Sequence, residues 1–186
     1  MDANVTKTKW NAKLIALVGM MAAVTCVLGP LSIPLPISPV PISLTNFAIY
    51  LAIYVLGTKR GILSYVIYLL IGLVGLPVFS AFTGGPGKLL GPTGGYLIGF
   101  LPMALICGIF IEKSQKRDLH FIGMVIGTVI AYVFGTAWLA WQAEMTFGAA
   151  LAAGVIPFIP GDLAKIIICM MIGPELRKRL RAAGLV

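Results

Sequence analysis

Long stretches without any charged residue are the feature that most limits how this chain can fold. Asp, Glu, Lys, Arg and His are all absent between Lys13 and Lys59, between Arg60 and Lys88, between Lys88 and Glu112, and between His120 and Glu144. A helix needs about 20 mostly apolar residues to cross the hydrocarbon core of a bilayer. Each interval is long enough for a crossing, so we expect helices that span a membrane.

The composition argues against the common classes of soluble protein. Of the 186 residues, 59% are hydrophobic and 11% are charged, and the mean hydropathy is +1.01. Soluble domains carry about 25% charged residues, which cover their surface. A soluble enzyme, a disordered chain and a nucleic-acid binder are therefore not expected, despite a net charge of +8. The expected fold class is an all-α integral membrane protein.

The first uncharged interval is long enough for two spans with a proline-rich bend between them. We therefore expect one transmembrane domain over residues 1–186, with re-entrant or lid-like outer loops and six spans, near residues 14–29, 46–58, 61–77, 95–111, 121–141 and 155–174.

The distribution of basic residues supports six spans with both termini in the cytoplasm. In that topology, twelve of the fourteen Lys and Arg residues lie on the inner side, and the outer side keeps Lys88 and Lys165. An excess of Lys and Arg on the cytoplasmic side is what the positive-inside rule describes. The sequence thus predicts a multi-pass protein of the cell membrane, and its positive charge needs no nucleic-acid partner.

Residues 30–44 form an unusual outer loop, because they contain five prolines and are almost wholly apolar. Proline fixes φ and cannot continue a helix, so the segment is expected to be extended or polyproline-like. An apolar, rigid loop is expected to fold back on the protein or the membrane surface. It forms either part of a lid or pocket wall, or a structural outer cap.

Residues 75–100 contain eight glycines, and the neighbouring spans 46–58 and 95–111 are short. Non-helical backbone at membrane depth is tolerated where it is buried in protein or lines a cavity. Short spans next to Gly and Pro indicate a site built from broken helices. A binding loop is favoured here over a passive connector.

Asp162 and Lys165 are the charges that fall inside the last expected span. At a spacing of three they share one face of a helix that begins near Pro160. Ionisable groups inside a span usually face a cavity or each other. Asp162 then caps the helix, pairs with Lys165, or faces a polar ligand together with Lys165. These interpretations are compatible, and the ligand role is favoured.

Other polar and aromatic residues are expected on the same outer side, where a few placed polar groups in an apolar pocket suit a small amphiphilic solute. The candidate ligand-binding residues are Asp162, Lys165, Thr45, Asn46, Phe79, Gly91, Thr93, Tyr96, Ser43 and Val40. Trp138 and Trp141 fit an interfacial aromatic belt, although Trp141 is within reach of the expected pocket.

The first span carries small residues four apart, Ala12 and Ala16, followed by Gly19 and Ala23. Small residues at this spacing let another helix approach closely. The pattern fits either packing inside the six-helix bundle or an interface with a partner.

Four motifs of this sequence resemble those of the BioY family, the biotin-specific S components of energy-coupling-factor (ECF) transporters. They are PVPISLTN (39–46), GLPVF (75–79), LLGPTGGYLIGF (89–100) and PGDLAK (160–165). The resemblance extends from about residue 12 to 176. It implies six helices, a ligand site near the outer surface, and assembly with a transmembrane coupling subunit and two cytoplasmic ATPases.

The resemblance also implies roles for particular residues. Ala12 and Ala16 match the alanine motif through which family members dock on the coupling subunit. Asp162, Lys165, Thr45 and Asn46 match residues that bind the vitamin, although many relatives carry Gln where this chain has Asn46. We therefore expect a biotin-binding subunit of an ATP-driven uptake system that holds no cofactor and no metal.

Two rival functions remain open from the sequence alone. A secondary carrier for biotin or a related solute, driven by an ion gradient, would have to rely on Asp162, Glu144 and Lys165, which are few groups for a proton relay. A membrane enzyme with its site at the same loops would need a nucleophile–base pair or paired carboxylates. The sequence shows neither arrangement, and it has no Walker A motif.

Overall fold

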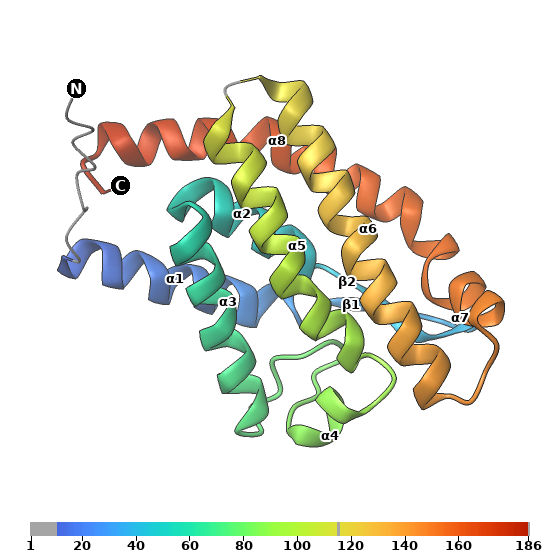
Figure 1. Cartoon of the computed structure of the whole chain (residues 1–186). Coiled ribbons are helices and arrows are strands. Elements are labelled where there is room, and N and C mark those ends of the chain that lie inside the picture. Colours follow the sequence, from blue (N-terminus) through green and yellow to red (C-terminus); the bar gives the residue numbers. More distant parts are fainter. Residues whose placement is uncertain (1–10, 115, 186) are drawn as a thin grey trace, which may run out of the picture.

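The structure is a computed structural model that describes residues 11–114 and 116–185. Its elements, in chain order, are α1 (Ala12–Leu28), β1 (Ser32–Leu35), β2 (Ser38–Ser43), α2 (Thr45–Leu56), α3 (Thr58–Leu73), α4 (Pro86–Leu90), α5 (Gly94–Lys113), α6 (Arg117–Gln142), α7 (Phe147–Gly154), η1 (Ile156–Phe158) and α8 (Ile159–Ala182) (Figure 1). Three segments of the described chain are long and apolar enough to cross a bilayer, namely Gly94–Lys113, Arg117–Gln142 and Phe147–Ala182.

The predicted all-α membrane fold is confirmed, with one small addition. The proline-rich loop pairs with itself as the antiparallel hairpin β1–β2, in which Ser32 lies opposite Ser43. The extended backbone that the prolines predict is therefore present, and residues of β2 also face the interior. The hairpin runs from the end of α1 toward α7 (Figure 1).

Helix bounds differ from the expected spans at two places. Helix α3 ends at Leu73 rather than near residue 77, because the chain turns at Gly75 with φ of 109°, a conformation that glycine adopts without strain. The last span is preceded by a separate short helix, α7, and α8 continues past Pro174 to Ala182.

Helix α2 is the centre of the bundle, with ten of its twelve residues buried. At 1.5 Å per residue it is about 18 Å long, too short to cross a bilayer on its own, but its backbone is surrounded by protein. Its tyrosines reach neighbouring helices: the Tyr50 hydroxyl lies 2.6 Å from Thr128 Oγ1 on α6. Helix α2 therefore sets the positions of the helices around it.

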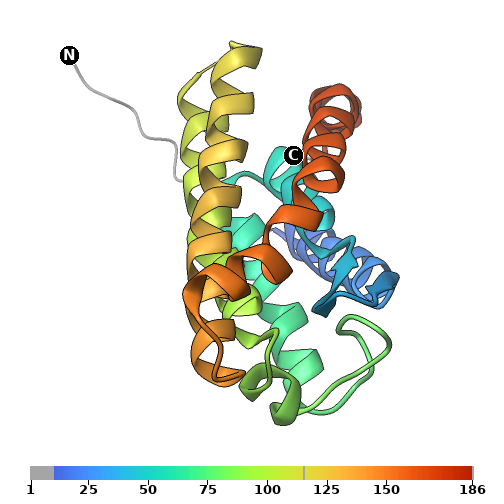
Figure 2. The same ribbon diagram turned by 90° about the vertical axis from the view of Figure 1, so that its right-hand side faces the viewer.

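Helices α5 and α6 form a closely packed antiparallel pair on one side of the molecule (Figure 2). A Cβ atom added at Gly99 would come 2.9 Å from Cβ of Phe134, and one added at Gly127 would come 2.6 Å from Sγ of Cys107. Real side chains do not approach so closely, so glycine is required at both positions. Helix α8 lies on the other side of α6 and forms a more open contact with it (Figure 2).

The two ends of the bundle differ in charge. One end, here called the basic end, carries the α2–α3 junction, the α5–α6 connection and the last turns of α8, with Lys59, Arg60, Lys113, Arg117, Arg177, Lys178, Arg179 and Arg181. The opposite end carries α4, α7 and the turn of the hairpin (Figure 1).

Candidate ligand-binding site

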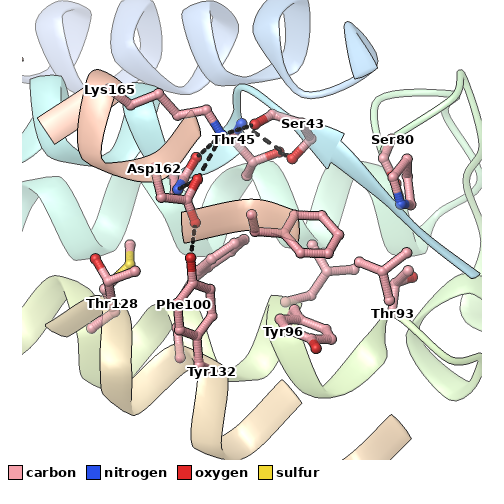
Figure 3. Close-up of a pocket in the computed structure, with 17 residues that line it drawn as sticks. Ser43, Thr45, Ser80, Thr93, Tyr96, Phe100, Thr128, Tyr132, Asp162 and Lys165 are labelled. Carbon is pink, nitrogen blue, oxygen red and sulfur yellow. Dashed lines mark hydrogen bonds and ion pairs between the residues drawn. The ribbon is translucent and has the colours of Figure 1, made fainter. Parts of the chain in front are cut away.

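A pocket lies between the hairpin and helices α2, α5, α6 and α8 (Figure 3). It is toward the end opposite the basic end, since Thr45, Tyr96 and Asp162 belong to the first turns of α2, α5 and α8. Its lining residues are Val40, Pro41, Ser43, Thr45, Asn46, Ser80, Thr93, Tyr96, Leu97, Phe100, Met103, Thr128, Ala131, Tyr132, Phe158, Asp162 and Lys165. They come from six separate elements and two loops, so the pocket exists only in the folded bundle.

Asp162 and Lys165 form a buried ion pair at one end of the pocket. Lys165 Nζ lies 2.8 Å from Asp162 Oδ1, and the side chains of Lys165 and Asp162 are only 10% and 9% exposed. Helix α8 begins at Ile159, and the side chain of Asp162 makes no capping bond to it. Of the interpretations drawn from the sequence, the ion pair is thus present and the cap is not.

Asn46, from the first turn of α2, completes a three-residue network with this pair. Its Nδ2 donates to Asp162 Oδ1 at 2.9 Å, and its Oδ1 accepts from Lys165 Nζ at 3.1 Å. An amide that offers both a donor and an acceptor suits this position, since its neighbours are a carboxylate and an ammonium.

Lys165 also connects α8 to the hairpin. Its Nζ donates to the backbone oxygen of Ser43, the last residue of β2, at 2.6 Å. With the bonds to Asn46 and Asp162, all three ammonium hydrogens have acceptors. A ligand that accepts from Lys165 must therefore replace one of these three bonds.

Tyr132, on α6, is a functional candidate that the sequence reasoning missed. Its hydroxyl donates to Asp162 Oδ2 at 2.6 Å. A carboxylate offers about four acceptor positions, and the observed bonds occupy three of them. One acceptor position on Oδ2 remains for a ligand. A tyrosine within an apolar helix gave no signal that distinguished it from a core residue.

The far end of the pocket is also polar, whereas its middle is apolar. Ser80 and Thr93 lie at that end, away from Asp162, and the ring of Phe100 contributes to the apolar wall (Figure 3). Thr93 Oγ1 is buried and has no hydrogen-bond partner among the described residues. Tyr96 presents its ring to the pocket while its hydroxyl donates to Gly154 O at 2.8 Å.

The structure brings together eight of the ten sequence-predicted ligand residues: Asp162, Lys165, Thr45, Asn46, Thr93, Tyr96, Ser43 and Val40. It does not bring Phe79 or Gly91 into the pocket. Phe79 is fully buried, with its ring against Tyr68. The carbonyl of Gly91 accepts a 2.9 Å bond from Trp138 Nε1, which ties the α4–α5 loop to α6. Trp141 is 70% exposed and does not reach the pocket.

The small residues of α1 lie on the surface of the described chain. Ala12, Ala16, Gly19 and Ala23 are all exposed, and a Cβ added at Gly19 would meet no atom within 4 Å. Packing inside the bundle therefore does not explain this pattern. A strip of small exposed residues leaves room for the close approach of a second helix.

Comparison with known proteins agrees with the motifs and with the fold. The model of the BioY family matches residues 3–182, nearly the whole chain. The chain belongs to the BioY family. The resemblance drawn from four short motifs is therefore confirmed.

Relatives and a solved structure extend this assignment. The chain is 38% identical over 146 residues to the "Biotin transporter BioY" of Thermotoga maritima, covering 78% of this chain and 86% of the relative. It is 38% identical over 167 residues to the "Probable biotin transporter BioY" of Pyrococcus horikoshii, covering 90% and 98%. It superposes with a TM-score of 0.83 on the crystal structure of "the S-component for biotin from an ECF-type ABC transporter", at 35% identity and covering 89% and 91%.

Proposed function

We propose that this chain is the biotin-binding S component of an ECF transporter. The observation that carries the proposal is the buried network of Asp162, Lys165 and Asn46, which closes one end of an otherwise apolar pocket. Similarity to biotin transporters and to a solved S component for biotin supports biotin as the solute. The chain captures the vitamin without covalent chemistry, metal or cofactor.

The chemistry of the network selects which end of biotin it binds. The ureido ring has N–H donors beside a C=O acceptor, whereas the valerate group is an anion. A carboxylate acceptor next to an ammonium donor complements the ureido group, while Asp162 repels a second carboxylate. The ureido oxygen therefore accepts from Lys165, and a ureido N–H donates to Asp162 Oδ2. The valerate extends toward Ser80 and Thr93.

The pocket must widen to admit the vitamin. Its volume is about 60 Å³, whereas sites for small molecules typically measure about 300–1,000 Å³. We infer that the hairpin moves, since it contributes Val40, Pro41 and Ser43 to the lining and is tied to α8 by the bond from Lys165 to Ser43. When the ureido oxygen replaces that carbonyl as acceptor, capture of the ligand and movement of the hairpin become coupled.

The partners and the orientation follow from the same proposal. The exposed strip Ala12–Ala16 on α1 is the docking surface for a transmembrane coupling subunit, which joins two cytoplasmic ATPases. The basic end faces the cytoplasm, in accordance with the positive-inside rule, and the pocket opens toward the outer face of the cell membrane. A carrier driven by an ion gradient is not favoured, because the solved relative is a subunit of an ECF-type transporter.

Isothermal titration of the purified protein with biotin tests this function. We expect saturable heat at one-to-one stoichiometry, and much weaker binding of 2-iminobiotin, whose protonated imino group meets Lys165 instead of a carbonyl oxygen. The absence of binding heat, together with the absence of bound biotin in the purified protein, would refute the proposal.

A further inference from the structure

A second cavity, at the basic end, is separate from the biotin pocket. It has a volume of about 370 Å³ and lies where the last turns of α8 pass α2, α5 and α6. The two cavities share no lining residue. Nothing in the capture of biotin requires this second cavity, so its residues call for another explanation.

Three cations from α8 line the cavity: Arg177, Lys178 and Arg181. Among the described residues, none of the three has a carboxylate oxygen within 4.0 Å, whereas the neighbouring Arg179 pairs with Glu175 at 2.8 Å. Arg177 is partly buried, and the Arg181 guanidinium is close enough to repel it. Three cations thus converge at a partly buried place where Glu112 supplies one opposite charge, so a further anion stabilises the arrangement.

The remaining polar groups of the cavity already have partners. His120 Nε2 lies 2.8 Å from the Ser114 carbonyl, which only accepts, so this nitrogen carries the hydrogen. The other ring nitrogen, Nδ1, lies 3.2 Å from the Tyr54 hydroxyl. Glu112 Oε1 accepts from the backbone N–H of Thr58 at 2.7 Å. Glu112 is the one carboxylate in the cavity lining, and the three α8 cations outnumber it. These cations remain the groups that recognise a ligand.

An apolar groove lies on the same face of α8, nearer to the start of the helix, and it shares no lining residue with this cavity. The groove measures about 340 Å³ between α6, α7 and α8, and Val129, Val133, Leu163 and Ile166 are among its lining residues. One face of α8 links the two places, because residues spaced three or four apart share a helix face. This face carries positions 163, 166, 170, 174, 177 and 181. Leu163 and Arg177 are separated by about 21 Å along the axis, at 1.5 Å per residue, enough to cross one leaflet of a core about 30 Å thick.

We propose that the cations of α8 bind the phosphate of an anionic phospholipid from the leaflet at the basic end, and that one of its acyl chains lies in the α6–α8 groove. Charge complementarity accounts for the head group, and the apolar groove on the same helix face accounts for the chain. Basic pockets between transmembrane helices bind lipid head groups in this way. The inference holds whether or not the solute is biotin.

Native mass spectrometry in detergent, with added phosphatidylglycerol or phosphatidylcholine, tests the head-group site. We expect the wild-type protein to prefer phosphatidylglycerol by about tenfold, since each basic group near an anionic lipid contributes several-fold in affinity. Arg177→Gln/Arg181→Gln is expected to abolish that preference and to bind biotin normally, which shows that the variant is folded. The matched control Lys116→Gln/Arg179→Gln removes two exposed cations at the same end and is expected to keep the preference.

A second experiment distinguishes a bound lipid from a bound soluble anion. Val129 lines the groove and not the biotin pocket, although the two share Thr128, Tyr132 and Asp162. Val129→Trp, which fills the groove, is expected to weaken binding of long-chain but not of eight-carbon phosphatidylglycerol and to leave biotin binding unchanged. Inorganic phosphate at millimolar concentration is expected not to displace the lipid. The proposal is overturned if the wild-type protein shows no preference, if the control loses it equally, if phosphate competes fully, or if Val129→Trp affects both chain lengths alike.

Discussion

The hydroxyl of Tyr132 on α6 donates a 2.6 Å hydrogen bond to Oδ2 of Asp162 on α8. This bond crosses the open contact between the two helices, at the point where the proposed biotin pocket and the α6–α8 groove meet. It fixes the carboxylate so that one acceptor position still faces the pocket. Tyr132 is therefore a positioning residue in the proposed site as well as a wall of it.

Tyr132→Phe is expected to weaken biotin binding by about tenfold, because a hydrogen bond to a charged group contributes about 1.5–3 kcal/mol. Isothermal titration measures this change. Tyr65→Phe is the matched control, since it removes a buried hydroxyl that donates to Leu97 O at 2.7 Å from outside the pocket lining. Equal losses of affinity in the two variants would mean that Tyr132 has only a structural role.

Removing one member of the buried ion pair is expected to destabilise the protein more than removing both. Lys165→Met leaves Asp162 buried without its cation, and breaking a buried pair in this way costs about 3–5 kcal/mol. Asp162→Asn/Lys165→Met removes both charges and is expected to recover most of the thermal stability.

Loss of biotin binding is expected for Lys165→Met and for Asp162→Asn/Lys165→Met. Lys88→Met, outside the pocket, is expected to keep the stability and the biotin binding of the wild-type protein. Thermal unfolding in detergent, with and without biotin, separates the two effects. A double variant that still binds biotin with wild-type affinity would place the site elsewhere.

Biotin is expected to slow hydrogen exchange in the hairpin. In the proposed mechanism β1 and β2 open before the vitamin enters, and a bound ligand then holds the hairpin closed. Exchange measured by mass spectrometry should fall for residues 32–43 and stay unchanged for the far end of α1, around Leu14 and Leu17. Unchanged exchange in the hairpin would show that the ligand enters by another route.

Docking on the coupling subunit is expected to depend on the small residues of α1. Ala12→Trp/Ala16→Trp places two large side chains on the strip and should abolish biotin uptake in cells that carry the coupling and ATPase subunits. Biotin binding by the purified variant should be unchanged. Ile122→Trp, at an exposed position of α6, serves as control and should transport normally. Retained uptake in the double variant would reject this docking surface.

The sequence predicted the parts of the fold that the bilayer dictates. Charge-free intervals mark the helices because an uncompensated charge in the hydrocarbon core is costly. The three-residue spacing of Asp162 and Lys165 predicted that they share a helix face, and the structure shows them paired. Helix α7, which was not predicted from the sequence, has a local signal: Thr146 precedes an alanine-rich segment, and its Oγ1 accepts from Ala149 N at 3.3 Å.

The rest of the site depends on contacts between distant segments, which a single sequence does not show. Tyr132 reaches Asp162 only because of how α6 and α8 pack together. The same holds for Phe79, which follows a glycine turn and was expected in the pocket. Its ring lies instead against Gly72 and Tyr68 of α3, where the absence of a side chain at Gly72 makes room for it.

A crystal structure of this protein with biotin tests the central claim most directly, through the distance from the ureido oxygen to Lys165 Nζ. We expect a hydrogen bond of about 2.7–3.2 Å, with a ureido N–H on Asp162 Oδ2 and the valerate near Ser80 and Thr93. Biotin bound with its valerate on Lys165, or bound outside the pocket, would contradict the account.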